Sequence, residues 1–142
     1  VIIDGTVLPG LEPGRPVLAV AADPWPGREI VKAGPDVSTL TERAVVRTPS
    51  RMGQLLQVLP PGPVGRWDEA SHLSIEIADS SFQSRTPLAT LNGEGLLLIQ
   101  RATGWELLAY REASLVGADT WQLSGLLRGQ QLRWRTCRLH RR

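Results

Sequence analysis

Apolar and polar residues alternate along several short stretches of the chain, a pattern typical of strands that bury one face in a sheet. In His72–Ala78 the residues Leu73, Ile75 and Ile77 point to one side, and Ser74 and Glu76 to the other. The same alternation predicts strands over Trp105–Tyr110 and Thr120–Leu127, with a turn at Gly117-Ala118-Asp119. Shorter runs between Pro/Gly turns predict further strands at Val17–Ala22, Arg28–Lys32, Ser38–Arg47 and Gly53–Leu59.

Two details refine this strand pattern. Val17–Ala22 is uniformly apolar, which predicts a strand buried on both faces. Asn92-Gly93-Glu94 lies between the runs Thr86–Leu91 and Gly95–Arg101, and Asn-Gly between apolar runs predicts a β-hairpin. No window holds a 3.6-residue period for more than about two turns. We therefore expect a mostly β fold, an antiparallel β-sandwich or distorted barrel of about eight short strands.

Composition divides the chain into three parts. Residues 1–16 are rich in Pro and Gly and predict an extended connector, residues 17–130 form the β domain, and residues 131–142 form an Arg-rich tail. The formal net charge is +2, yet all 14 acidic residues lie at or before Asp119, and the last fifteen residues hold six arginines. The tail could be disordered or could contact nucleic acid; we favour disorder. No apolar run reaches the roughly 18 residues that a membrane-spanning helix needs.

Candidate reactive groups are few. The two histidines, His72 and His140, lie far apart in the sequence, and Cys137 is the single cysteine. This spacing predicts no metal site and no cofactor. Asp68-Glu69 follows a Pro/Gly loop, so a solvated turn is favoured over a catalytic carboxylate pair, which would need a cleft and a separation of about 5–10 Å. We expect a protein that is not an enzyme.

The tryptophans are the candidate binding residues. Trp105 and Trp121 fall on alternating strands and are expected in the core. Trp25 lies between prolines and Trp67 at a loop exit, so each is either a plug at the end of the β domain or a platform on which a sugar stacks. The plug is the favoured interpretation.

Ordered sequence blocks add a family resemblance. The chain resembles the C-terminal part of the large tail-tip protein of gene transfer agents and related siphophages, often called the host-specificity or megatron protein. The blocks that carry the resemblance are LAVAADPWPG (Leu18–Gly27), Met52-Gly53, LPPGPVGRWD (Leu59–Asp68), LATLNG (Leu88–Gly93), GWELLAY (Gly104–Tyr110), and Tyr110 through Gln130, which ends in LSGLLRGQ. The family usually continues LLRGQ with Gly-Thr and an acidic residue, whereas here QLRWRTCRLHRR follows.

The resemblance implies a structural module of a particle tail tip or baseplate. Such a module would assemble with other tail-tip subunits, in a trimer, and would contribute to host-surface contact and DNA delivery. It would be assembled in the bacterial cytoplasm and released with the particle. The alternative is a carbohydrate-binding module at the same tip, with Trp25 or Trp67 contacting a host cell-surface glycan.

Overall fold

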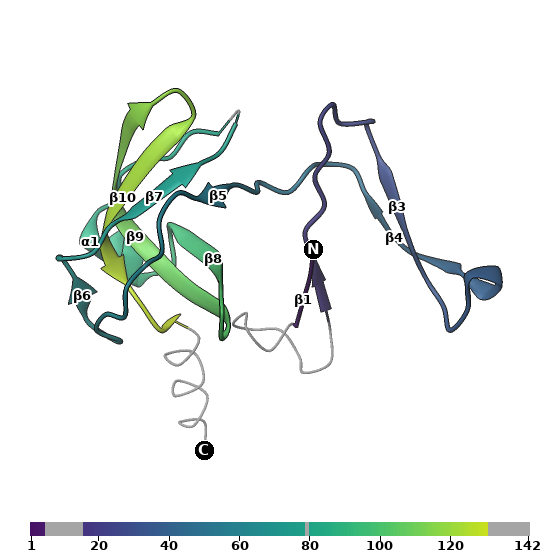
Figure 1. Ribbon diagram of the computed structural model, residues 1–142, viewed down its shortest axis with the longest axis horizontal. Helices are drawn as coiled ribbons and strands as arrows, with labels where there is room; N and C mark the ends of the chain where they lie inside the picture. Colours follow the sequence, from purple (N-terminus) through teal and green to yellow (C-terminus); the bar gives the residue numbers. More distant parts are fainter. Residues whose placement is uncertain (5–15, 79, 131–142) are drawn as a thin grey trace, which may run out of the picture. The chain divides into compact units, whose positions relative to one another are not determined.

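The protein is described by a computed structural model that covers residues 1–4, 16–78 and 80–130 (Figure 1). These residues group into two compact units. The first comprises Val1–Ile3 and Pro16–Met52, and the second contains Asp4 and the described residues from Gly53 onward. Within them the regular structure is mostly antiparallel β, which confirms the predicted fold class; five strands of the second unit curl into a half-barrel.

The first unit is a pair of two-stranded sheets. Strands β1 (Ile2–Asp4) and β2 (Pro16–Leu18) form one sheet, and β3 (Glu29–Ala33) and β4 (Thr41–Val46) form an antiparallel hairpin. The expected strand over Ser38–Arg47 starts late, because a short 3-10 helix, η2 (Val37–Thr39), occupies its beginning.

Asp36 explains that late start. Its side chain accepts hydrogen bonds from the backbone N–H and the hydroxyl of Ser38, both at 2.8 Å. The Thr39 hydroxyl in turn accepts from the backbone N–H of Asp36 at 3.2 Å. This reciprocal capping box satisfies the free N–H groups at the start of a helical turn, and it outweighs the strand preference of the β-branched residues Val37 and Thr39.

The burial predicted for the first apolar run is wrong. Strand β2 covers only Pro16–Leu18, and no residue of Val17–Ala22 is buried. Only Val17 and Leu18 of the run lie in this two-stranded sheet, so its apolar composition does not indicate a buried central strand.

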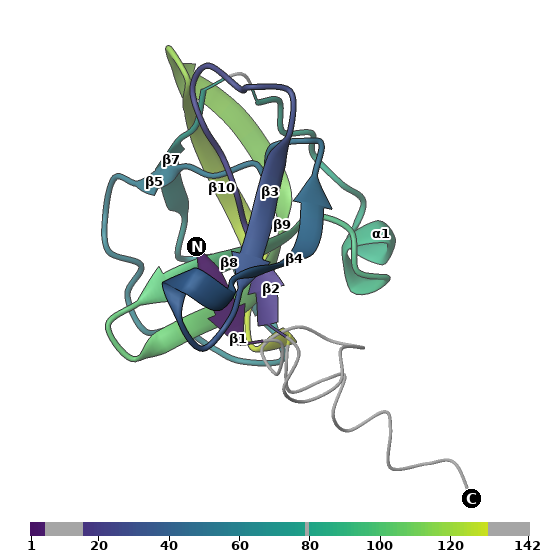
Figure 2. The same ribbon diagram turned by 90° about the vertical axis from the view of Figure 1, so that its right-hand side faces the viewer.

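The second unit is built around its last strand, β10 (Thr120–Leu127). One edge of β10 pairs with β9 (Gly104–Gly117), and the other edge pairs first with β7 (Leu73–Glu76) and then with β6 (Trp67–Asp68). Strand β8 (Leu96–Arg101) adds to β9, and β5 (Gln54–Leu55) adds to β7. Figures 1 and 2 show β9 and β10 as a long curved hairpin at the centre of this sheet.

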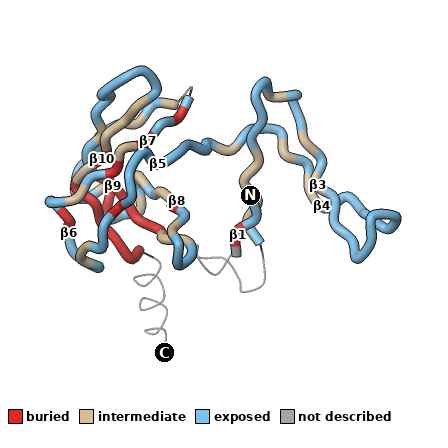
Figure 3. Tube along the Cα trace, viewed as in Figure 1, coloured by how far each residue is buried: buried red, intermediate tan, exposed pale blue. Residues whose placement is uncertain are grey.

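The hydrophobic core lies inside this curl. Figure 3 shows the buried residues concentrated in the second unit, over β7, β9 and β10. Leu73, Ile75 and Ile77 are buried while Glu76 is exposed, which confirms the predicted half-buried strand. Nine buried side chains form the main cluster: Leu59, Leu73, Ile75, Ile77, Ile99, Leu108, Tyr110, Leu123 and Leu126.

Gly125 interrupts the alternation of β10. Leu123 and Leu126 both join the core cluster although they are three residues apart, not two or four. Between them Gly125 has a φ of 60°, a left-handed conformation that residues with a Cβ rarely adopt. A Cβ at Gly125 would also crowd the side chain of Arg111 on the neighbouring strand. The glycine of LSGLL therefore changes which side chains face the core.

The predicted hairpin at Asn92-Gly93 is wrong: the run before it is helix α1 (Pro87–Leu91). Thr86 caps the helix by accepting a hydrogen bond from the backbone N–H of Ala89, and Pro87 occupies the first helical position, where its missing N–H costs nothing.

Gly93 is needed at the C-terminal end of α1. Gly93, with φ 96°, donates its N–H to Thr90 O, and Glu94 donates to Ala89 O. These two bonds form a Schellman motif. Asn-Gly thus ends a helix here, and the Thr90 hydroxyl contacts the backbone of β9 at Tyr110 O.

The predicted division into a connector, one β domain and a tail stays a prediction. Most of the connector and all of the Arg-rich tail, residues 131–142, lie outside the described residues.

Candidate functional site

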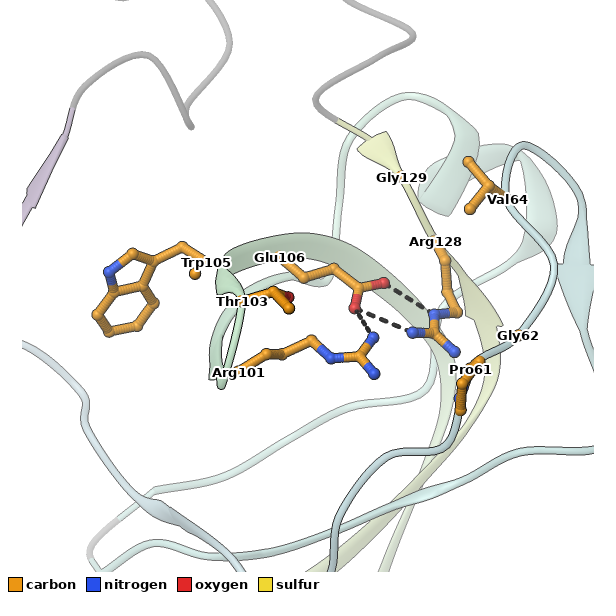
Figure 4. Close-up of a pocket in the computed structure, with 10 residues that line it drawn as sticks. Pro61, Gly62, Val64, Arg101, Thr103, Trp105, Glu106, Arg128 and Gly129 are labelled. Atoms are coloured by element: carbon orange, nitrogen blue, oxygen red, sulfur yellow. Dashed lines mark hydrogen bonds and ion pairs between the residues drawn. The ribbon is translucent and has the colours of Figure 1, made fainter.

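A buried arginine stands at the end of the central strand. Arg128 follows β10 directly, and its side chain is only 3% exposed. It reaches Glu106 on β9 with two parallel hydrogen bonds, Nε to Oε1 at 2.8 Å and Nη2 to Oε2 at 2.9 Å (Figure 4). This two-pronged geometry is the strongest form of a guanidinium–carboxylate pair.

A second arginine and two backbone carbonyls complete the pairing. Arg101, at the end of β8, donates from Nη1 to Oε2 of the same Glu106. Arg101 Nη2 donates to Leu59 O at 3.1 Å, and Arg128 Nη1 donates to Pro60 O at 2.7 Å. The two guanidinium groups therefore tie the β8–β9–β10 sheet to the Pro-rich loop that follows Leu59.

Asp68 supplies the second carboxylate. It is 2% exposed and lies in β6, so the prediction that Asp68-Glu69 forms a solvated turn is wrong for Asp68, whereas Glu69 is exposed. Asp68 Oδ1 accepts the backbone N–H groups of Ala70 and Ser71 at 3.2 and 3.0 Å. Asp68 Oδ2 lies 3.9 Å from Arg128 Nη1 and accepts no hydrogen bond from the described residues.

We call Arg101, Glu106, Arg128 and Asp68 the Arg128 cluster. Its two positive and two negative charges balance. Burial raises the pKa of Glu106, but the hydrogen bonds and charges of Arg128 and Arg101 outweigh it and hold that pKa below its usual value. Burial likewise raises the pKa of Asp68, but hydrogen bonds from Ser71 and Ala70 and the charge of Arg128 lower it overall. Both groups are therefore carboxylates near neutral pH.

The Arg128 cluster joins sequence blocks that lie far apart in the chain. WD of LPPGPVGRWD pairs with LL of LSGLLRGQ, since Asp68 is opposite Leu126 and Trp67 is opposite Leu127. GWELLAY supplies Glu106.

Two glycines allow this close approach. A Cβ at Gly62 would overlap Asp68 Oδ2 and Arg128 Nη1, and a Cβ at Gly129 would overlap the side chain of Val64. Residues of LPPGPVGRWD, GWELLAY and LSGLLRGQ thus contact one another at the Arg128 cluster.

A pocket of about 440 Å³ opens beside the cluster. Its walls are the β8–β9 turn at Thr103, the loop at Gly62 and Val64, and the guanidinium groups of Arg101 and Arg128. Figure 4 shows Arg101, Glu106 and Arg128 pointing toward one another, while the indole of Trp105 points away from them. Trp105 is half-buried, so its predicted place in the core is wrong.

A second group of charges surrounds Trp67. The guanidinium of Arg111 lies 5.3 Å from the centre of the Trp67 ring, within cation–π range. Arg111 also makes two hydrogen bonds of 3.2 Å to Glu69 and pairs with Glu112. We call Arg111, Trp67, Glu69 and Glu112 the Arg111 cluster.

The predicted sugar-stacking residues lie in different units. Trp67 is half-buried in the second unit, with Arg111 packed against its ring. Trp25 is half-buried in the first unit, and its indole N–H donates to Arg47 O at 3.3 Å. Trp121, also expected in the core, is only partly buried: it packs against the core cluster and edge-on against Phe82, with ring centres 5.5 Å apart.

Among the residues that the structure describes, no group of three or more His, Cys, Asp or Glu side chains could hold a metal ion. Over the same ranges, no helix has the length and hydropathy to cross a membrane.

Comparison with known proteins gives one family and no curated relative. The family model described as Rcc01698-like, C-terminal, matches residues 50–132, which is more than half of the chain. A search of curated proteins finds no match. The matched range covers the sheet of the second unit, both charged clusters and the pocket. Rcc01698 is a gene transfer agent protein, and the chain belongs to the Rcc01698-like C-terminal domain family.

Proposed function

We propose that this chain is a structural module of the tail tip of a gene transfer agent particle, assembled with other tail-tip subunits in a trimer. In this proposal it contributes to host-surface contact and DNA delivery and carries out no catalysis. It is assembled in the bacterial cytoplasm and leaves with the particle. The family match over residues 50–132 is the observation that carries the proposal.

The chemistry of the Arg128 cluster supports a structural role. A glycan-cleaving enzyme with two carboxylates needs one of them protonated, with a raised pKa. The pKa values of Asp68 and Glu106 are both lowered instead, and Glu106 is engaged by two arginines. An arrangement in which opposite charges satisfy one another suits a junction that joins strands, not a proton donor.

The contacts of the two candidate tryptophans also favour the structural role over sugar stacking at these residues. The Arg111 guanidinium packs against Trp67, and the polar edge of Trp25 is already bonded to Arg47 O. A glycan array tests the alternative. Saturable sugar binding that is lost in Trp25→Ala or Trp67→Ala would favour a carbohydrate-binding module at those sites.

Labelling of intact particles tests the location. An epitope inserted at the exposed Ala118 turn, in the protein as the producing cell makes it, is detected with gold-coupled antibody by electron microscopy. We expect gold at the distal end of the tail. A second epitope at Val37, which is 85% exposed, is the matched control in the other unit and should label the same place. Gold on the head, along the tail tube, or on no particle would refute the proposal.

A further inference from the structure

The pocket beside the Arg128 cluster has more hydrogen-bond donors than acceptors. A guanidinium carries five N–H groups. Arg101 uses two of them, toward Glu106 and Leu59 O, which leaves three, including the one on Nε. Its side chain is 27% exposed and lines the pocket.

The acceptors near these donors are largely occupied. A carboxylate offers about four lone-pair positions, and Glu106 already accepts three hydrogen bonds from the two arginines. The Thr103 hydroxyl, in the turn that follows Arg101, makes no hydrogen bond to the described residues and can donate or accept. A ligand that satisfies this pocket must therefore bring acceptors, and a carboxylate facing the free edge of the Arg101 guanidinium is the group that fits best.

The volume of the pocket and the exposure of its arginines restrict the class of ligand further. About 440 Å³ is within the range of small-molecule sites and leaves space for a ring beside the anionic group. Thr103 and the remaining lone pair of Glu106 can serve the hydroxyls of that ring. Only one guanidinium of the pocket is partly exposed, that of Arg101 at 27%, whereas Arg128 is 3% exposed; this disfavours nucleic acid, whose sites present several accessible basic groups.

We propose that this pocket binds the carboxylate-bearing sugar of an acidic polysaccharide, with Arg101 contacting the carboxylate and Thr103 a ring hydroxyl. Neither Trp25 nor Trp67 lines this pocket. The inference goes beyond the structural role proposed above, and its test does not depend on where the domain lies in a particle.

The test is an NMR titration of the full chain with glucuronate, followed through the backbone amides of Thr103 and Gly104. We expect saturable shifts with glucuronate and none with glucose. Absence of saturation with glucuronate, equal binding of glucose, or tighter binding of inorganic phosphate or of a DNA oligonucleotide would each overturn the proposal.

Variants locate the contact. Arg101→Lys keeps the charge but loses the planar fork, and we expect affinity for glucuronate to fall about tenfold or more. Arg66→Lys is the matched control, because Arg66 is exposed and outside the pocket lining, and it should bind as the unmodified chain does.

A second variant separates loss of binding from loss of folding. Thr103→Val changes an exposed turn residue that makes no hydrogen bond to the described residues, so its fold should be intact, and weaker glucuronate binding is expected. Unchanged affinity in Thr103→Val, together with unchanged affinity in a folded Arg101→Lys, would exclude this pocket as the site.

Discussion

The two units differ in what stabilises them. Of the buried apolar residues in the described chain, twelve lie in the second unit and one, Ile3, in the first. The first unit has instead a set of backbone bonds, such as Ala19 N to Val1 O at 2.9 Å and Ser50 N to Val20 O at 2.7 Å. Its hairpin leaves Ile30 and Val45, which face each other across β3 and β4, about 40% exposed.

This difference has a physical consequence. A two-stranded ribbon buries little apolar surface and is marginally stable alone, whereas three or more strands around a shared core can fold independently. The first unit is therefore expected to open more readily than the second. Family membership, the buried junction and the pocket all belong to the unit that has the core.

The largest effect is expected from Arg128→Met, which removes the two-pronged partner of the partly buried Glu106 and the positive charge 3.9 Å from the buried Asp68. Removing one member of a buried ion pair typically costs about 3–5 kcal/mol. Urea denaturation measures the loss. Arg43→Met, at an exposed position of β4, is the control and should change stability by about 0.5 kcal/mol or less. Equal effects of the two variants would remove the distinction between the units.

The next effect compares one apolar side chain from each unit. Leu123 is fully buried in the core. Leu123→Ala should lower the free energy of unfolding by about 2–5 kcal/mol, because it removes buried apolar surface and leaves a cavity. Val45→Ala, at a 40% exposed position, should cost well under about 1 kcal/mol. Both are read from urea midpoints. A Val45 variant as destabilised as the Leu123 variant would mean that the ribbon has a core of its own in solution.

Gly62→Ala tests the close approach at the Arg128 cluster. The new Cβ would overlap Asp68 Oδ2 and Arg128 Nη1, so either the loop or the buried pair must move. Forcing an extra carbon into a packed site costs about 1–3 kcal/mol. The Tm measures it, with Arg66→Ala, at an exposed position of the same loop and outside the cluster, as a control. A Gly62 variant as stable as the parent would show that the loop does not press on the cluster.

The smallest expected effect is the pH dependence of the free energy of unfolding in the acid range. The folded pKa values of Glu106 and Asp68 lie below their ordinary values of 4.5 and 3.8, so as the pH falls the unfolded chain takes up protons first. Their stabilising contribution is complete above about pH 4.5 and is lost as the pH falls through the lowered folded values.

Urea midpoints measured across this range give the slope. Asp68→Asn should reduce the slope of the urea midpoint against pH for the second unit. Asp36→Asn, whose pKa is lowered by hydrogen bonds from Ser38 in the first unit, should leave that slope unchanged. A slope that Asp68→Asn does not alter would contradict the assignment.

Local patterns predicted much of the second unit. Alternation identified β7, because Leu73 and Ile75 meet the core while Ser74 and Glu76 do not, and it identified β10 up to Gly125, where the pattern breaks. The same logic failed where local chemistry dominates. Asn92-Gly93 can end a helix as readily as it can turn a hairpin, and the deciding signal was Thr86-Pro87, a helix start that alternation does not register.

The site could not be predicted from residue types alone. Asp68 and Arg128 are sixty residues apart, and a charged residue next to a Pro/Gly loop normally faces solvent. Their burial follows from the pairing of β6 with β10, a long-range contact that local sequence patterns do not reveal. One usable signal was present: Arg128 directly follows Leu126-Leu127, so it continues a buried strand.

The order of the strands along the chain bears on synthesis. β10 pairs with β6, β7 and β9, yet it is the last of the four to leave the ribosome. Until it emerges, β6 has no pairing partner among the described strands, and the nascent segment exposes apolar strand edges that invite aggregation. Completion of the sheet therefore waits on translation of its final eight residues, and a stop codon introduced just before Thr120 would release a polypeptide that no chaperone could bring to this fold.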